Sequence, residues 1–344
     1  MKILFVYPFF LSESALEQRW MTLYPPLGLL YLAAAVRLAG HSVAVFDGTF
    51  ASGDEDFVAA LDLHRPDVVC LASLVTLRPT ALRLAGLARS RGIIAIAGGP
   101  DPTASPADYL FARASRAGEV FDVVVSGEAD ATLPEVLAAI EKRQSLAKLQ
   151  GVVLASRTGQ IVRSAARPPI PQIDALPFPT RDLIDIPRYL HAWRSAHGYA
   201  SLTIAASRGC PFGCEHCANS AAGPHWRVRS IDNIVREMAE LEKQYGPDRF
   251  RLVDDFDGLG REWLAALGRA MVDARLRTPF EGLKPSHLEG VPMLSEAKDI
   301  CAERNAWLSS GSEDVHAAPA LGLDDLLSRW REAKVREGER PPET

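Results

Sequence analysis

The chain has 344 residues, of which 47% are hydrophobic and 24% are charged, and its formal net charge is −5. This length predicts two domains, and the acidic balance gives no electrostatic argument for a nucleic-acid partner. No apolar run reaches the roughly 20 residues of a membrane helix. The N-terminus, MKILFVYPFF, lacks a small-residue cleavage site. It indicates a first strand, so we expect a cytoplasmic protein with reduced thiols.

The first part of the chain alternates apolar, β-branched runs with helical patterns. Strands buried on both faces are predicted over residues 2–7, 42–47, 68–73, 93–98 and 122–127. Helices are predicted between them, over residues 27–38, 80–89, 106–114 and 131–142. This alternation predicts an α/β fold with a doubly wound, Rossmann-like parallel sheet over residues 1–148.

The ends of three predicted strands carry small or polar residues. In such sheets, ligands bind beyond the carboxyl ends of the strands, and small residues let a bulky planar ligand approach the backbone. An ordinary turn is an equally good interpretation of the glycines. No G-x-G-x-x-G follows the first strand and no P-loop is present, so a dinucleotide site is not indicated. The three ends are Ser73-Leu74-Val75-Thr76, Gly98-Gly99-Pro100 and Gly127-Glu128.

Residues 149–198 are predicted to join this sheet to a second domain over residues 199–334. Residues 151–164 have the pattern of a hairpin around Thr158-Gly159. Residues 166–183 are rich in proline and predict an ordered linker. Residues 335–344 form a polar tail that we expect to be frayed.

Three of the five cysteines, Cys210, Cys214 and Cys217, have the spacing C-x3-C-x2-C. Structural zinc normally takes four ligands in two separated pairs. Cys70 and Cys301 lie in a predicted strand and helix, where small core residues are expected. Three thiolates suit a cubane iron–sulfur cluster with one open iron, since such clusters normally take four cysteines. Zinc held by the three cysteines with His216 or His225 is the alternative, and a disulfide is disfavoured.

This cysteine motif, at the end of a strand predicted over residues 202–206, resembles the hallmark of the radical S-adenosylmethionine (SAM) superfamily. The chain resembles the cobalamin-binding branch of this superfamily over RGCPFGCEHCANS, residues 226–241 and residues 249–256. It resembles the B12-binding domain of that branch over residues 24–41, 97–106 and 124–137, and the interdomain segment over residues 173–183. The resemblance covers about residues 1–315. It implies a partial (βα) barrel after the first domain.

The resemblance implies that Cys210, Cys214 and Cys217 each bind one iron of a [4Fe-4S] cluster, whose open iron binds SAM. An electron from an external donor would cleave SAM to methionine and a 5′-deoxyadenosyl radical. Cobalamin in this branch commonly passes a methyl group to a substrate carbon. SAM contacts are implied for Phe212, His216, Asp254, Asp255, Ser310, Ser312 and Glu313, although a solvated loop or helix cap explains the aspartates equally well. Cobalamin contacts are implied for Ser73, Leu74, Val75, Thr76, Gly98, Gly99, Pro100, Gly127 and Glu128.

The sequence departs from the family pattern at several points. His216 stands where an aromatic residue is usual, either as a substitute for its packing or to tune the cluster through a hydrogen bond. The D-x-H-x-x-G motif of methionine-synthase-like domains is absent. We therefore expect Leu74, Val75 and Leu77 to line the lower face of cobalamin, without a histidine ligand to cobalt.

The chain shows fewer βα units than the family's catalytic domain, which predicts an open sheet edge. A homodimer, a partner subunit or the helix predicted over residues 323–334 would cover it. The predicted function is a cobalamin-dependent radical SAM enzyme that methylates a carbon of a small molecule. The alternatives are an accessory cobalamin or iron–sulfur protein that needs a partner chain, and a radical rearrangement or cyclisation enzyme.

Overall fold

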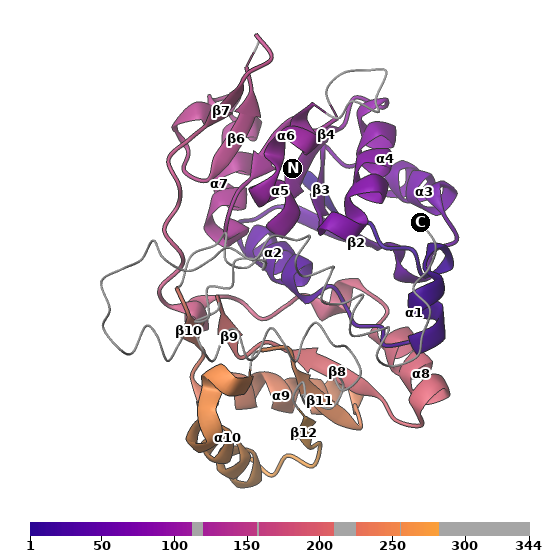
Figure 1. Ribbon diagram of the computed structural model, residues 1–344, viewed down its shortest axis with the longest axis vertical. Coiled ribbons are helices and arrows are strands. Elements are labelled where there is room, and N and C mark those ends of the chain that lie inside the picture. Colours follow the sequence, from indigo (N-terminus) through magenta and orange to yellow (C-terminus); the bar gives the residue numbers. More distant parts are fainter. Residues whose placement is uncertain (112–119, 157, 210–224, 255, 282–344) are drawn as a thin grey trace, which may run out of the picture. The chain divides into compact units, whose positions relative to one another are not determined.

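The computed structural model describes residues 1–111, 120–156, 158–209, 225–254 and 256–281 (Figure 1). The chain divides into two units, Met1–Gly282 and Leu283–Thr344. All of the described residues belong to the first unit. Among them, no helix is both long and apolar enough to cross a membrane.

A seven-stranded sheet with the strand order β2-β1-β3-β4-β5-β6-β7 forms the first part of this unit. Its first five strands are parallel, as predicted. They are β1 (Lys2–Tyr7), β2 (Ser42–Asp47), β3 (Val68–Ala72), β4 (Ile94–Gly98) and β5 (Val123–Val125). The order reverses between β1 and β3, so the sheet is doubly wound and its switch point lies between these two strands.

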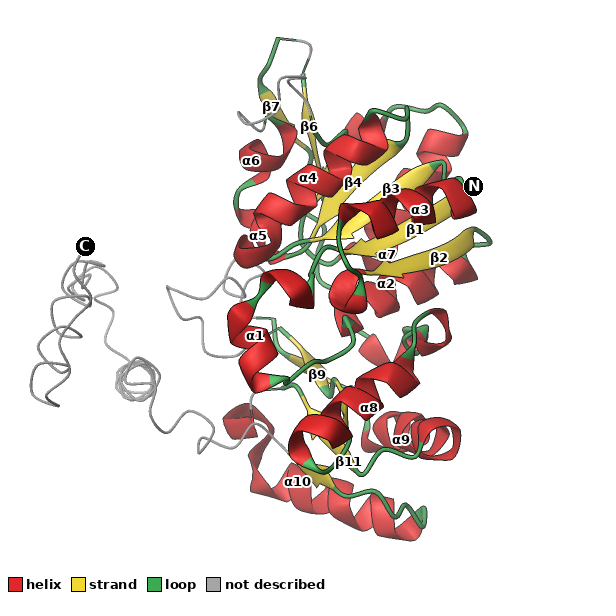
Figure 2. Ribbon diagram, turned by 90° about the vertical axis from the view of Figure 1, so that its right-hand side faces the viewer, coloured by secondary structure: helices red, strands yellow, loops and turns green. Residues whose placement is uncertain are grey.

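Helices cover both faces of this sheet (Figure 2). Alternate residues of β1 divide between two cores, with Ile3 and Phe5 on one face and Leu4 and Val6 on the other. The first core contains α2 (Leu27–Leu38) and α7 (Ala129–Glu141); the second contains α3 (Asp54–His64), α4 (Arg78–Arg89) and α6 (Pro106–Leu110). The chain also forms α1 (Ala15–Trp20), α5 (Pro100–Ala104) and 3-10 turns at Leu11–Glu13, Gly48–Phe50, Val75–Leu77, Leu146–Lys148, Ile173–Ala175 and Arg181–Leu183.

The predicted hairpin forms from β6 (Val152–Ala155) and β7 (Ile161–Arg163). β6 also pairs antiparallel with β5, so the hairpin extends the first sheet. The sequence instead predicts that the hairpin belongs to the joining segment over residues 149–198. Val152 and Val153 are both only 2% exposed, because successive side chains of β6 pack into the cores on opposite faces of the sheet.

A second, parallel sheet has the order β12-β11-β8. Its strands alternate with helices, as expected for the start of a (βα) barrel. The chain order is α8 (Ile186–His197), β8 (Ser201–Ile204), α9 (Ile231–Tyr245), β11 (Arg249–Leu252), α10 (Phe256–Asp273) and β12 (Phe280–Glu281). Between β8 and α9, β9 (Ser207–Arg208) pairs antiparallel with β10 (Arg227–Val228). The helix predicted over residues 323–334 lies outside the described residues.

Residues 21–26 of the first part pack against the second. The indole Nε1 of Trp193, on α8, donates a hydrogen bond of 2.5 Å to the carbonyl of Leu23. Arg251, on β11, donates to the hydroxyl of Tyr24 at 2.8 Å. The two sheets are therefore joined through a segment that precedes α2.

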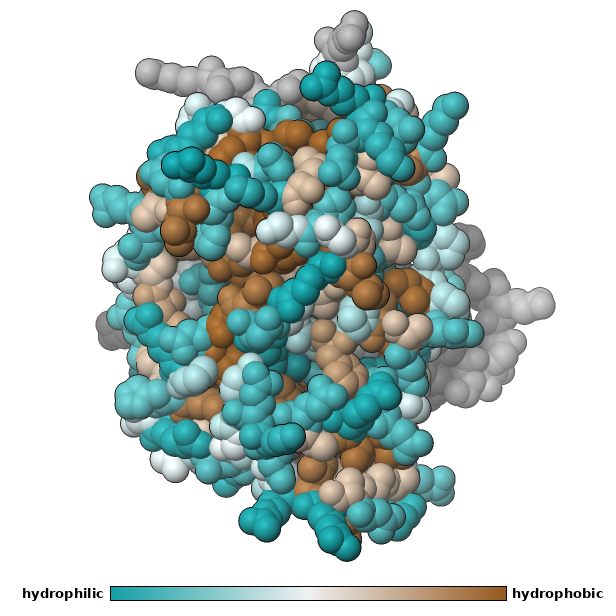
Figure 3. All heavy atoms as spheres, turned by 180° about the vertical axis from the view of Figure 1, so that it is seen from behind, coloured by the Kyte–Doolittle hydropathy of each residue, from teal (hydrophilic) through white to brown (hydrophobic). Residues whose placement is uncertain are grey.

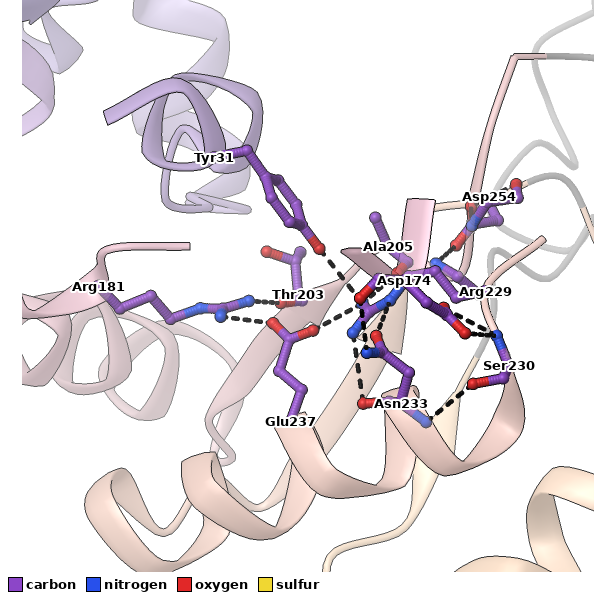
Figure 4. A network of polar contacts seen from close by, with 12 residues as sticks. Tyr31, Asp174, Arg181, Thr203, Ala205, Arg229, Ser230, Asn233, Glu237 and Asp254 are labelled. Atoms are coloured by element: carbon purple, nitrogen blue, oxygen red, sulfur yellow. Dashed lines mark hydrogen bonds and ion pairs between the residues drawn. The ribbon is translucent and has the colours of Figure 1, made fainter. Parts of the chain in front are cut away.

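A buried carboxylate, Glu237 on α9, lies between two guanidinium groups (Figure 4). It accepts hydrogen bonds of 2.6 Å from both Arg181 and Arg229, and the three side chains are 1%, 4% and 5% exposed. Arg181 also donates to the carbonyl of Thr203, and Arg229 to that of Ala205. The linker, the end of β8 and α9 are thus fixed to one another by a single anion.

We predict that Glu237→Gln lowers the free energy of unfolding by about 3–5 kcal/mol, because two buried cations would lose their counter-charge. Chemical denaturation followed by circular dichroism measures this change. Glu240→Gln, on an exposed position of the same helix, is the control and should change stability by less than about 0.5 kcal/mol. Equal effects of the two substitutions would contradict this account.

Candidate functional site

A cavity of about 400 Å³ lies at the carboxyl ends of β1, β3, β4 and β5. This is the edge where doubly wound sheets bind ligands, next to the switch point. Its apolar wall includes Leu27, Leu29, Leu32, Leu71, Leu74, Leu77, Ile96, Val125 and Leu133. Ala205, Arg208 and Val253 contribute to it from the second part of the unit. Leu74 and Val253 are 47% and 44% exposed, so apolar surface faces solvent here.

Seven of the residues predicted to contact cobalamin line this one cavity. The fold therefore brings together residues that the sequence singled out, and their contact with cobalamin stays a prediction. Val75 and Thr76 do not line the cavity, whereas Leu77 does, because residues 75–77 form a turn that directs Val75 outward, where it is 66% exposed. The seven are Ser73, Leu74, Gly98, Gly99, Pro100, Gly127 and Glu128.

The backbone itself requires Gly99. Its φ angle is +110°, and a Cβ atom at this position would lie 2.7 Å from the carbonyl oxygen of Ser73. The ends of β3 and β4 therefore meet too closely for any side chain at residue 99. Chain packing explains this glycine without a ligand, whereas a Cβ at Gly127 would meet nothing within 4 Å.

A buried polar cluster lies behind Ser73 in the cavity wall. The hydroxyl of Tyr109 is 2.7 Å from the Ser73 hydroxyl and donates to Asp101 at 2.5 Å. Arg78 donates two hydrogen bonds to Asp101, at 2.6 and 2.7 Å, and these hold the pKa of that carboxyl below its usual value. Burial raises the pKa of Tyr109, so its phenol stays protonated. The cluster fixes Ser73 at the end of β3.

Two acidic residues after β5 form one rim of the cavity, and both are ion-paired. Arg208 donates to Asp130 at 2.6 and 2.9 Å. Arg227 donates to both carboxylate oxygens of Glu128, which also accepts from the backbone N–H of Ile170. Burial alone would raise the pKa of Glu128, but these hydrogen bonds outweigh it and leave the pKa lowered.

Sequence reasoning missed Asp130, Arg208 and Arg227. Arg208 and Asp130 are separated by 78 positions in the chain, and Arg227 and Glu128 by 99. No local sequence pattern reveals pairs at such separations. The available signals were the position of Arg208 two residues before Cys210, and of Asp130 two residues after Glu128.

Asp254, one of the predicted SAM contacts, supports the chain that leads into the cysteine motif. Its carboxylate accepts hydrogen bonds from the backbone N–H groups of Ala206 and Ser207, at 2.5 and 2.6 Å, and from the Ser207 hydroxyl. Burial raises its pKa. A SAM contact for Asp254 stays a prediction. The other predicted metal and SAM residues lie outside the described part of the chain: Cys210, Phe212, Cys214, His216, Cys217, Asp255, Ser310, Ser312 and Glu313.

Comparison with known proteins gives matches across most of the chain. Residues 21–137 match the family model of the B12 binding domain. An uncharacterized methyltransferase of Pyrococcus horikoshii is 30% identical over 82% of this chain and 58% of its own length. An anaerobic magnesium-protoporphyrin IX monomethyl ester cyclase of Synechocystis is 28% identical over 67% of this chain and 45% of its own. The chain thus spans about half the length of these curated relatives.

The fold also matches a solved structure. The cobalamin-dependent SAM radical enzyme OxsB, with aqua-cobalamin and SAM bound, superposes with a TM-score of 0.64 at 16% identity. The match covers 81% of this chain and 38% of that one. It confirms the predicted fold class, with a doubly wound sheet followed by parallel strands of radical SAM type.

We predict that Gly99→Ala destabilises the protein more than Gly127→Ala. Both glycines have positive φ angles, which cost about 1–2 kcal/mol for an alanine. Only residue 99 adds a steric conflict with the backbone of Ser73. Urea denaturation of both variants measures the difference, and a Gly127→Ala variant as unstable as Gly99→Ala would contradict the packing argument.

Proposed function

Since the chain belongs to the cobalamin-binding radical SAM superfamily, we propose that it is an enzyme that binds cobalamin in the cavity beyond β1, β3, β4 and β5. Cys210, Cys214 and Cys217 would hold a [4Fe-4S] cluster, which would supply an electron from an external donor for the cleavage of SAM. The reaction methylates a carbon of a small-molecule substrate. One observation carries the proposal: the cavity is walled both by the B12-type sheet and by residues next to β9, which leads into the cysteine motif.

The cavity has the features that a corrin ring requires. A flat macrocycle needs an apolar wall and close approach to backbone, and the cavity offers Leu74, Leu77 and Val253 together with Gly98. Of the three residues expected to line the lower face of cobalamin, Leu74 and Leu77 line the cavity and would pack against the macrocycle, whereas Val75 does not line it.

When bound, cobalamin supplies a methyl carrier, and the cluster supplies the electron for SAM cleavage. The residues of the chain hold and shield these groups. Leu74 and Val253 would pack against the bound group at the mouth of the cavity, while Ser73, fixed by Tyr109 and Asp101, presents a hydroxyl in its wall. Arg208 and Arg227 tie the strands on either side of residues 210–224 to the rim.

Cyclisation is a second candidate reaction. The observation in its favour is the relative named as a magnesium-protoporphyrin IX monomethyl ester cyclase. Both candidates share the cobalamin site and the radical, and they differ in whether SAM donates a methyl group as well as the radical.

The decisive experiment measures SAM turnover. The protein is purified without oxygen, reconstituted with iron, sulfide and cobalamin, and given SAM and a strong reductant. We expect 5′-deoxyadenosine from radical formation, and S-adenosylhomocysteine if cobalamin is methylated. 5′-Deoxyadenosine alone would favour cyclisation. Neither product from a protein loaded with both cofactors would refute the enzyme and point to an accessory role with a partner chain.

The two cofactor assignments separate by substitution. Cys214→Ala should abolish the cluster, measured as iron and sulfide content, while cobalamin binding persists. Gly98→Leu should weaken cobalamin binding, measured by absorbance titration, while iron content persists, because Gly98 lines the cavity and a Cβ there meets only the carbonyl of Val125 at 3.9 Å. Cys301→Ala serves as the control and should retain both cofactors. Full iron in the Cys214→Ala protein, or unchanged cobalamin affinity in the Gly98→Leu protein, would remove the corresponding assignment.

A further inference from the structure

We infer that Arg208 and Arg227 are positioning residues that couple the occupancy of the cavity to the geometry of the β9–β10 ladder. This inference rests on the proposed cobalamin site. It concerns four side chains: the two arginines, and their partners Asp130 and Glu128 on the cavity rim, of which Glu128 is also a proposed cobalamin contact.

The ladder is weak by itself. Each strand has two residues, and Arg208 is the direct cross-strand partner of Arg227. Like charges directly opposite one another in an antiparallel pair are destabilising. Two paired strands of this length would not persist alone in water. The ladder therefore requires a counter-charge from elsewhere in the protein.

The rim of the cavity supplies two counter-charges with matching spacing. Glu128 and Asp130 lie two residues apart at the start of α7, and each binds one arginine through both of its carboxylate oxygens. The side chains of Arg208 and Asp130 are 20% and 4% exposed, and those of Arg227 and Glu128 are 14% and 19% exposed. Because these pairs are largely shielded, removing one partner leaves a poorly solvated charge.

Contacts with neighbouring residues hold the two strands of the ladder together, so that they move as one unit when the cavity rim shifts. Arg208 lies over the ring of Tyr31 on α2, with its guanidinium carbon 5.0 Å from the ring centroid. Gly209 has a φ angle of +81°, and any side chain there would collide with the carbonyl of His225, two residues before β10. Asp254 fixes Ala206 and Ser207 at the other end. A shift of the rim is therefore transmitted to both strands rather than absorbed by one.

The cavity and the ladder share residues. Gly127, Glu128, Asp130 and Arg208 all line the cavity, so a ligand that packs against this rim restricts the acids that hold the ladder together. Coupling of this kind is reciprocal, because each event changes the free energy of the other by the same amount. Bound cobalamin should stabilise the paired state of β9 and β10, and stable pairing of these strands should raise the affinity for cobalamin.

Hydrogen exchange tests this coupling without measuring activity. The full-length, cluster-reconstituted protein is compared with and without cobalamin, and exchange is followed in peptides that contain residues 205–209 and 225–229. In the wild-type protein we expect cobalamin to slow exchange there about tenfold, within the range typical of coupled sites. Arg227→Gln should reduce this effect to less than about twofold. Glu128→Gln should do the same and provides a second variant if the first does not fold.

Arg83→Gln is the matched control. Arg83 also pairs with two acids, Glu13 and Asp54, but does not line the cavity. This variant should keep the full effect of cobalamin on the ladder. Cobalamin binding with unchanged ladder exchange, or an undiminished effect in both rim variants, would overturn the inference and leave the proposed function intact. Failure of the wild-type protein to bind cobalamin would overturn both.

Discussion

The carboxylate of Glu237 is the constraint on which the arrangement of the site depends. It neutralises Arg181 from the linker and Arg229 from the chain before α9, and Arg229 also donates to Ala205 and to Tyr31 on α2. Ala205 lines the cavity, and β9 follows two residues later. A single buried anion therefore fixes the positions of the end of β8, the linker and α2 relative to one another. Any other arrangement would leave a buried charge unpaired, which is strongly destabilising.

The cavity arises where two incomplete surfaces meet. A doubly wound sheet leaves a crevice at its switch point, and small residues at the ends of β4 and β5, Gly98-Gly99 and Gly127, leave it unfilled. The second part closes one side with Ala205, Arg208 and Val253. The face seen in Figure 3 carries hydrophobic side chains in patches within a largely hydrophilic surface. The apolar surface that stays open at Leu74 and Val253 is consistent with a site whose occupant completes the packing.

The predictions that succeeded from sequence were those set by local periodicity. β1, β2 and α2 have the predicted bounds because continuous apolar runs and a Pro-Pro start are local signals. The pairing of β6 with β5 depends on strand order, which the hairpin pattern does not contain. Glu128 was assigned to a ligand from its position after a strand, whereas its observed partner, Arg227, lies 99 residues away. Asp254 similarly meets Ala206 across 48 residues. Such polar partners become predictable only once the tertiary fold is known.

The contacts of residues 21–26 also constrain the order in which a nascent chain can fold. Tyr24 receives its hydrogen bond from Arg251, 227 residues later, and Leu23 receives one from Trp193. At a synthesis rate of about 5–20 residues per second, the ribosome adds Arg251 on the order of 10–50 s after Tyr24. The first sheet can form in that interval, but the segment that leads into α2 stays without its final partners. A chaperone that shields this segment during translation would therefore protect a contact whose two partners are 227 residues apart in the chain.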